Sequence, residues 1–167
     1  MLSVMTAAPL EIAAASQATG MASLAWLLVA IPLASAGLLL VLGRRADGWG
    51  HWLGVAAATG SLAVGIALVA QLFSLEAGQR VLVEKVYTWI AAGSFQVDFA
   101  TRIDPLSATF VILVTFVGTL IHLYSVAYMD SDADRRRFFA YLNLFVAAML
   151  LLVIADSFAL LFVGWEG

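Results

Sequence analysis

Two side chains in the apolar parts of this sequence have the chemistry to carry protons, and the first is Glu166. It stands ten residues after Asp156 in a run that is otherwise apolar. A helix starting at that aspartate would bring the carboxyl group about 15 Å into a membrane, close to its middle. A charged group at that depth is costly unless it is paired or neutral, and it is typical of proton and ion pathways. We predict that Glu166 relays protons together with a cationic partner; the alternative is a hydrogen bond that only ties two helices together.

The second side chain is His122, which stands eighteen residues after Asp104. In a helix this spacing places it about 27 Å along the axis, near the far boundary of the membrane. Imidazole changes its charge near neutral pH. His122 is therefore a candidate for feeding protons into a relay from that side, and the alternative is an interfacial histidine hydrogen-bonded to a neighbour.

Other polar residues in or beside the apolar segments have simpler interpretations. Asp156 is expected to cap the helix that follows it. Asn143 and Ser107 are expected to bridge helices, and His51 with Trp52 to anchor a helix at the membrane interface.

The composition is that of a membrane protein. The chain has 167 residues, of which 63% are hydrophobic and only 11% charged, and its mean hydropathy is +1.02. A membrane helix needs roughly 20 mostly apolar residues. We predict an all-α polytopic membrane protein with a tail over residues 1–21 and a membrane domain over 22–167. Its helices are expected at about 22–42, 52–75, 105–129 and 138–155, with the start of a fifth at 157–167.

The segment at about 78–103 is predicted to form a β-hairpin between the second and third of these helices. Phe95, Val97 and Phe99 alternate with more polar or smaller residues, and a Gly-containing stretch separates them from a β-rich run. An open sheet edge does not face hydrocarbon, so the hairpin is expected outside the lipid. Directly after it, Asp104 and Pro105 mark the start of a helix.

The basic residues of the short connections predict the orientation. Arg44 and Arg45 follow the first predicted helix, and Arg135, Arg136 and Arg137 precede the fourth. Both groups fall on one side if the spans alternate. That side is expected to be cytoplasmic, with the N-terminus and the hairpin outside.

Several classes of function do not fit the residues present. A net charge of −3 without a basic stripe excludes nucleic-acid binding. Without cysteine, the chain has no disulfide, no thiolate metal site and no cysteine-held iron–sulfur cluster. It also has neither a Gly-rich phosphate loop after a strand nor a cluster of metal-ligand residues, so we expect no NADH, flavin or metal bound by this chain.

The last apolar run suggests that more chain follows. A helix over residues 157–167 would rise only about 16 Å, half the hydrocarbon thickness, and would end with unpartnered carbonyl groups in lipid. We therefore expect the N-terminal part of a longer polytopic protein. The alternative is a short protein whose last segment is a re-entrant stub.

The chain also resembles a known family, through motifs that occur in that family's order. They are YTWI at 87–90, RIDPLS at 102–107, IHLY at 121–124, RFFAYLNLF at 137–145 and GWEG at 164–167. Together they resemble the subunit L (chain 5) family of NADH-quinone oxidoreductase, the antiporter-like subunits of respiratory complex I. The resemblance covers residues 22–167.

This resemblance implies a proton-translocating membrane subunit that couples electron transfer from NADH to quinone to proton pumping. Glu166 would pair with a buried lysine on a later helix, outside this sequence. NADH, FMN, iron–sulfur clusters and quinone would belong to partner subunits. The partners would be the other membrane-arm subunits, especially the adjacent antiporter-like one, in the inner membrane of a bacterium.

Two alternatives to this function stay open. One is the large subunit of a multisubunit sodium/proton antiporter, a related branch that favours Phe-Trp-Glu-Leu over the Gly-Trp-Glu-Gly that ends here at Gly167. The other is a structural membrane subunit that moves no protons.

Overall fold

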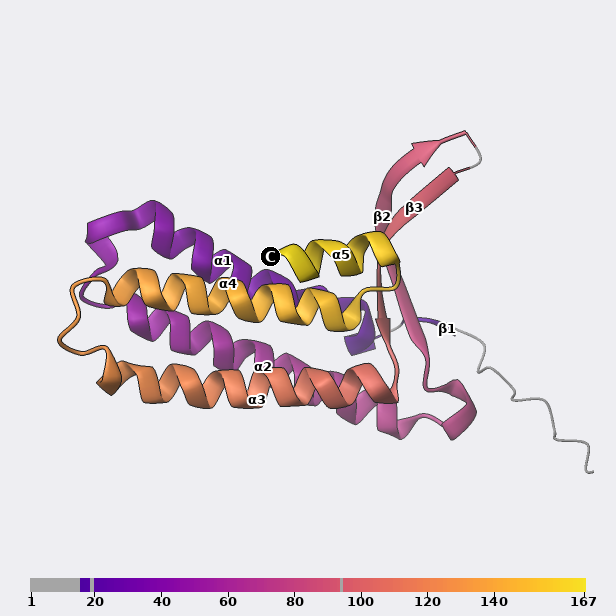
Figure 1. The fold of residues 1–167 in the computed structure, drawn as a ribbon. Coiled ribbons are helices and arrows are strands. Elements are labelled where there is room, and N and C mark those ends of the chain that lie inside the picture. Colours follow the sequence, from indigo (N-terminus) through magenta and orange to yellow (C-terminus); the bar gives the residue numbers. More distant parts are fainter. Residues whose placement is uncertain (1–15, 19, 94) are drawn as a thin grey trace, which may run out of the picture.

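A computed structural model describes residues 16–18, 20–93 and 95–167. Five α-helices and three strands make up this part of the chain, and the four long helices run alongside one another with a shorter fifth beside the fourth (Figure 1). The helices are α1 Leu27–Leu42, α2 Gly50–Ser74, α3 Pro105–Tyr128, α4 Arg135–Ile154 and α5 Phe158–Glu166. Three short 3-10 turns accompany them: η1 Gly20–Leu24, η2 Gly43–Ala46 and η3 Ala77–Gln79.

Four helical segments are long and apolar enough to cross a membrane, as the sequence predicts. They are Gly20–Ala46, Gly50–Ser74, Pro105–Tyr128 and Arg135–Ile154, with mean hydropathies of 2.4, 2.0, 2.1 and 2.1. The fourth helix begins at Arg135 rather than at residue 138. Its three arginines therefore form the first turn of the helix instead of a loop, which suits a residue type with high helix propensity.

The hairpin is formed by β2 Leu82–Ala92 and β3 Phe95–Ile103, which pair antiparallel. Gly93, with φ of +61°, turns the chain between them, a conformation that glycine adopts without steric cost. A two-residue strand, β1 Ser16–Gln17, pairs parallel with the start of β2. The predicted tail thus contributes a strand and the first two residues of η1 where it is described, and its residues 1–15 and 19 lie outside the described residues.

The start of α3 has the predicted cap. Asp104 Oδ1 accepts a hydrogen bond from the Ser107 backbone N–H at 2.8 Å, and Ser107 Oγ accepts one from the Asp104 N–H at 2.8 Å. This reciprocal capping box satisfies two backbone donors that the helix itself leaves free. The expectation that Ser107 bridges two helices is wrong, because its hydroxyl is used within this cap.

The helices meet over two buried apolar clusters. One joins α1, α2, α3 and α4 near the hairpin and includes Leu28, Leu72 and Leu150. The other lies toward the opposite end and includes Leu39 and Phe139. α1 packs on α2 and α4, α3 packs on the same two helices, and α5 packs on α4. We call the end of the bundle with β2 and β3 the hairpin end, and the end with η2 and the α3–α4 connection the loop end (Figure 1).

Candidate functional site

Helix α5, which carries Glu166, is capped by Ser157 rather than by Asp156. The Ser157 hydroxyl accepts a hydrogen bond from the Leu160 backbone N–H at 3.3 Å. The prediction for Asp156 is wrong because this aspartate lies one residue too early. It contacts the base of the hairpin instead, where its backbone N–H donates to the Ala100 carbonyl at 3.1 Å.

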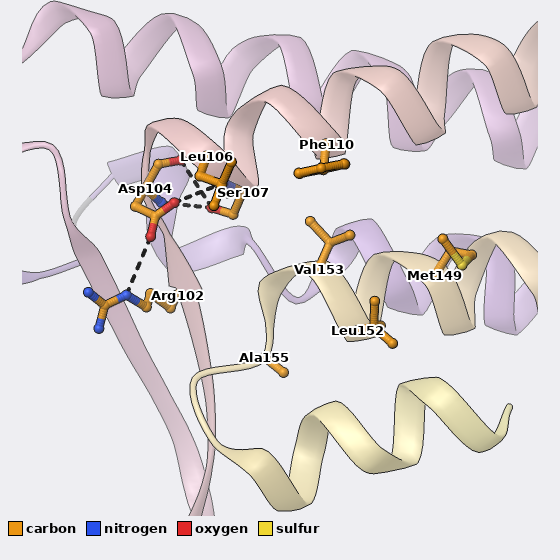
Figure 2. A pocket seen from close by; sticks show the side chains of 9 residues that line it. All are labelled: Arg102, Asp104, Leu106, Ser107, Phe110, Met149, Leu152, Val153 and Ala155. Atoms are coloured by element: carbon orange, nitrogen blue, oxygen red, sulfur yellow. Dashed lines mark hydrogen bonds and ion pairs between the residues drawn. The ribbon is translucent and has the colours of Figure 1, made fainter.

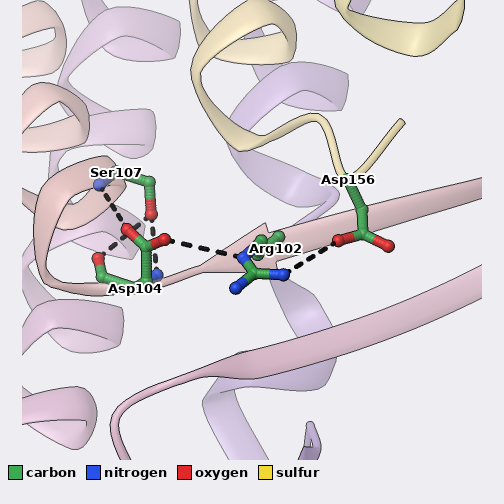
Figure 3. A network of polar contacts seen from close by, with 4 residues as sticks. All are labelled: Arg102, Asp104, Ser107 and Asp156. Carbon is green, nitrogen blue, oxygen red and sulfur yellow. Dashed lines mark hydrogen bonds and ion pairs between the residues drawn. The ribbon is translucent and has the colours of Figure 1, made fainter. Parts of the chain in front are cut away.

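Arg102 connects three elements at the hairpin end (Figure 3). Its Nε lies 3.6 Å from Asp104 Oδ2 at the start of α3, and its terminal nitrogen lies 3.6 Å from Asp156 Oδ1 in the α4–α5 turn. An isolated β-bridge between Thr101 and Ala155 reinforces the second connection. The base of β3 therefore orients the turn from which α5 departs.

Beside this network lies an apolar cavity between the start of α3 and the end of α4 (Figure 2). Its volume is about 340 Å³, and its walls are mostly apolar, with Leu106, Phe110 and Val153 among them. Arg102 and Asp104 are at its edge and already pair with each other. The cavity thus offers shape and an apolar lining but no charged group turned toward a ligand.

Gly164 sets the distance between α5 and α4. A Cβ atom at this position would lie 2.5 Å from the Leu152 backbone nitrogen and 2.9 Å from the Ala148 carbonyl oxygen. Only glycine permits this approach, since backbone atoms cannot move aside as a flexible side chain can. The close packing holds α5, and with it the last turn containing Glu166, against α4.

Glu166 itself is exposed on α5. Its carboxyl group has no hydrogen bond or ion pair with any described residue, in contrast to the aspartates that pair with arginine or lysine elsewhere in the chain. Its neighbour Trp165 is also exposed. The structure therefore presents Glu166 at the end of a firmly packed helix, with its carboxyl group available to another group.

His122 is enclosed inside the bundle, with 0% of its surface exposed. Its Nδ1 lies 2.7 Å from the Gly118 carbonyl oxygen one turn earlier in α3, and its ring lies 5.9 Å from the ring of Phe139 in α4. The hydrogen-bond partner of His122 is thus a residue of its own helix. Its Nε2 is buried and has no hydrogen-bond partner among the described residues.

The structure does not bring His122 and Glu166 together. His122 packs beside Phe139, whereas the end of α5 packs beside Ala148. Nine residues of α4 separate these two levels, which corresponds to about 13 Å along the helix axis. A direct proton transfer between the two side chains is therefore excluded, and any route between them needs further groups.

Two polar residues near His122 were misinterpreted from the sequence. His51 is only 6% exposed and lies inside the bundle instead of anchoring at its surface, although the adjacent Trp52 is 57% exposed and does face outward. Asn143 is fully buried, and its Nδ2 donates to the Phe139 carbonyl in its own helix at 3.0 Å rather than to a second helix. The spacing of His51 with Gly54 and small residues further along α2 could have indicated a buried face.

Within the described ranges, no three His, Cys, Asp or Glu side chains gather closely enough to hold a metal ion. Most charged side chains lie instead in the hairpin, at its base and at the loop end, where several form ion pairs. The class defined by this fold and these sites is a bundle of apolar, membrane-length helices with an acidic residue on a fifth helix.

Known proteins with similar sequences narrow this class. A family model described as the N-terminus of NADH-ubiquinone oxidoreductase (complex I) chain 5 matches residues 89–139. NADH-quinone oxidoreductase subunit L of Mycobacterium tuberculosis is 58% identical over 142 residues, covering 85% of this chain and 22% of the relative. Subunit L of Escherichia coli is 39% identical over 123 residues, covering 71% and 20%. Chain 5 of Dictyostelium citrinum is 39% identical over 125 residues, covering 71% and 19%.

The chain therefore belongs to the subunit L/chain 5 family of NADH-quinone oxidoreductase, as its motifs suggest. It spans about a fifth of the length of these relatives.

Proposed function

We propose that the chain is the N-terminal part of a proton-translocating, antiporter-like membrane subunit of NADH:quinone oxidoreductase. The observation that carries this proposal is the 58% identity to a subunit L over 85% of the chain. The subunit would couple electron transfer from NADH to quinone, which takes place in partner subunits with their FMN and iron–sulfur clusters, to proton movement across the membrane. Its neighbours would be other membrane-arm subunits, especially the adjacent antiporter-like one.

Helices α1 to α4 would span the inner membrane of a bacterium. Large apolar side chains cover their outer faces, among them Val41, Leu106 and Tyr124. The arginines of η2 and of the first turn of α4 lie together at the loop end, where Arg136 binds Asp47. By the positive-inside rule, this supports a cytoplasmic loop end, an external hairpin and an external N-terminus.

Glu166 would be the proton-relay residue of this part of the subunit. Its exposed, unpaired carboxyl group on α5 would meet a lysine from outside this chain, and the distance between the two charges would set the proton affinity of the lysine. Tight packing at Gly164 supports this role, because a relay group has to be held at a defined position. His122 would supply protons from the cytoplasmic side.

The test is Glu166→Gln in the full-length subunit within its complex. We expect assembly and NADH oxidation by the complex to persist, while NADH-driven acidification of inverted membrane vesicles is lost. Gln is nearly isosteric with Glu but carries no exchangeable acidic proton. Glu76→Gln, which changes an exposed acid in the α2–β2 connection, is the matched control and should pump normally.

Normal proton-to-electron stoichiometry in the Glu166→Gln complex would refute the relay role and favour a structural subunit. Purification of the native complex provides a second test. NADH-driven quinone reduction is expected, whereas purification with small membrane subunits only would support the sodium/proton antiporter instead.

A further inference from the structure

Three buried polar atoms gather around Phe139 without a hydrogen-bond partner among the described residues. They are Nδ1 of His51 in α2, Nε2 of His122 in α3 and Oδ1 of Asn143 in α4. The three side chains are 6%, 0% and 0% exposed. Buried polar atoms are almost always hydrogen-bonded in folded proteins, so three of them on side chains beside one phenylalanine require an explanation.

Phe139 is the common neighbour that places these side chains together. Its ring lies 6.2 Å from the ring of His51 and 5.9 Å from the ring of His122. Its carbonyl oxygen accepts the hydrogen bond from Asn143. A Cβ atom at Gly54 would lie 2.9 Å from Asn143 Nδ2, so the amide group also reaches the backbone of α2 one turn after His51.

The existing hydrogen bonds determine what the free atoms can accept or donate. The Gly118 carbonyl only accepts, so Nδ1 of His122 carries the hydrogen of their 2.7 Å bond. In the neutral ring, Nε2 is then an acceptor. The amide nitrogen of Asn143 donates to Phe139, which leaves Oδ1 as an acceptor too. Two acceptors cannot satisfy each other, and both need a donor from outside these side chains.

Water meets this requirement chemically, since it offers two donors and commonly bridges buried polar groups. The surrounding face of α3 provides further polar contacts. Thr119 and Thr115 are buried, and each hydroxyl donates to a carbonyl of its own helix at 2.7 Å, so each oxygen still has capacity to accept. Ser125 is buried on the side toward the loop end. A polar stripe thus runs along α3 past His122.

We infer that His51, His122 and Asn143 form a buried water-binding site, through which protons enter the bundle from the loop end. This inference rests on the proposed proton-translocating function. A hydronium ion at the bound water transfers its proton to Nε2 of His122 and becomes water. The resulting imidazolium donates from Nε2 to a second water and transfers the proton to it, which restores neutral His122 and leaves the second water as hydronium.

The charged groups at the loop end belong to the same route. Arg135 in α4 pairs with Asp130 in the α3–α4 connection at 3.1 Å and donates to the Val126 carbonyl of α3 at 2.8 Å. On the other side, Arg136 pairs with Asp47. Asp130 is largely exposed at the loop end and stands eight residues after His122 in the chain.

The test uses three variants of the full-length subunit in its complex, studied by electron cryo-microscopy and by proton pumping. Asn143→Leu removes the free acceptor at similar volume. His122→Asn keeps a donor toward Gly118 but has no nitrogen atom at the position of Nε2. His122→Gln places a polar amide near that position, which binds water but does not accept a proton. Ser61→Ala, which removes a buried α2 hydroxyl that donates to Leu28, is the control.

We expect water density at residues 122 and 143 in the unsubstituted complex and in Ser61→Ala, and its loss in Asn143→Leu and His122→Asn. His122→Gln should keep the water but lose proton uptake through this route. The water site would be refuted by a map that resolves waters elsewhere but shows protein groups bound directly to Nε2 of His122 and Oδ1 of Asn143. Unchanged pumping in His122→Gln would overturn the proton step.

The outcomes separate this inference from the proposed function. The water density is read from the map and does not depend on pumping. Normal pumping by Glu166→Gln would refute the relay role of Glu166 but would not affect the water site. Lost pumping by Glu166→Gln, together with no water density at residues 122 and 143 in the unsubstituted complex, would refute only the water site. If His122→Asn does not assemble, Asn143→Leu and His122→Gln still decide both steps.

Discussion

His122 and Glu166 are the two ionisable side chains predicted to carry protons, and their surroundings differ completely. His122 is enclosed by α2, α3 and α4 and contacts Phe139. Glu166 is exposed on α5 and has no polar partner among the described residues. The polar environment of the histidine is therefore set by the described residues, whereas they supply no polar partner to the glutamate.

The two ends of the bundle show a parallel difference. At the loop end, Arg136 is only 11% exposed and donates to the Leu39 carbonyl at 2.7 Å as well as to Asp47 at 2.8 Å. At the hairpin end, Arg102 is 41% exposed and its two ion pairs are 3.6 Å long. Short, shielded bonds stabilise more than long, exposed ones. The ion pair of Arg136 at the loop end is thus expected to stabilise the bundle more than the two ion pairs of Arg102 at the hairpin end.

Phe139→Ala should cause the largest loss, because this ring fills the buried region between both histidines. We expect a loss of about 3–5 kcal/mol of stability, typical for a truncated core phenylalanine. The thermal unfolding midpoint of the purified complex would measure it. Phe145→Ala changes an exposed ring of the same helix and should cost much less; equal losses would contradict the enclosure of the His122 region.

Gly164→Ala tests the packing that holds Glu166. The new Cβ would meet backbone atoms of α4, so we expect destabilisation of about 1–3 kcal/mol from overpacking, together with reduced proton pumping. Gly37→Ala is the matched control, since nothing lies within 4 Å of a Cβ there. That change should be neutral or stabilising by up to about 1 kcal/mol. Identical behaviour of the two variants would show that α5 is not held by this contact.

Arg136→Gln sharpens the comparison of the two ends. It removes a shielded charged donor from the Leu39 carbonyl and from Asp47, for which we expect a loss of about 1.5–3 kcal/mol. Chemical denaturation of the complex would measure the difference. Arg137→Gln, which affects an exposed pair with Asp134, should have little effect. A larger effect at Arg137 would contradict the assigned role of Arg136.

Arg102→Gln should have a smaller effect, about 0–1 kcal/mol, because both of its ion pairs are partly exposed. The variant should retain α5 against α4 through the Gly164 contact. Limited proteolysis of the hairpin would detect a loosened base. Lys85→Gln, which changes a residue within β2 rather than at the base, is the variant for comparison. A loss as large as that of Arg136→Gln would contradict the stronger stabilisation expected from Arg136.

The smallest effect concerns pH and the Lys85–Asp98 pair on the hairpin. Hydrogen bonds from the Lys85 ammonium, at 2.8 Å, and from the Gln96 amide lower the pKa of the Asp98 carboxyl below its ordinary value of 3.8. Stabilisation by a carboxylate with a lowered pKa is present above 3.8 and fades as the pH falls through the folded-state value. The difference in hairpin protease resistance between the native chain and Asp98→Asn should therefore be present at neutral pH and vanish in acid. A difference independent of pH would contradict the pairing.

Much of the fold was predictable from the sequence, because its signals are local. The four apolar segments, the hairpin and the Asp104 cap each depend on neighbouring residues. The start of α4 was missed, since three arginines before an apolar segment are equally typical of a loop. The role of Asp156 was also missed, because its partner Arg102 lies 54 residues earlier in the chain.

The sequence by itself determined the helices, the hairpin, the family and the presence of Glu166 and His122, because hydropathy, capping and motifs are properties of short segments. Only the tertiary structure decided that His51 and Asn143 join His122 around Phe139, and that Gly164 contacts the backbone of α4. The physical reason is that burial and hydrogen-bond satisfaction depend on which faces of separate helices meet. Those faces come together only when the bundle packs.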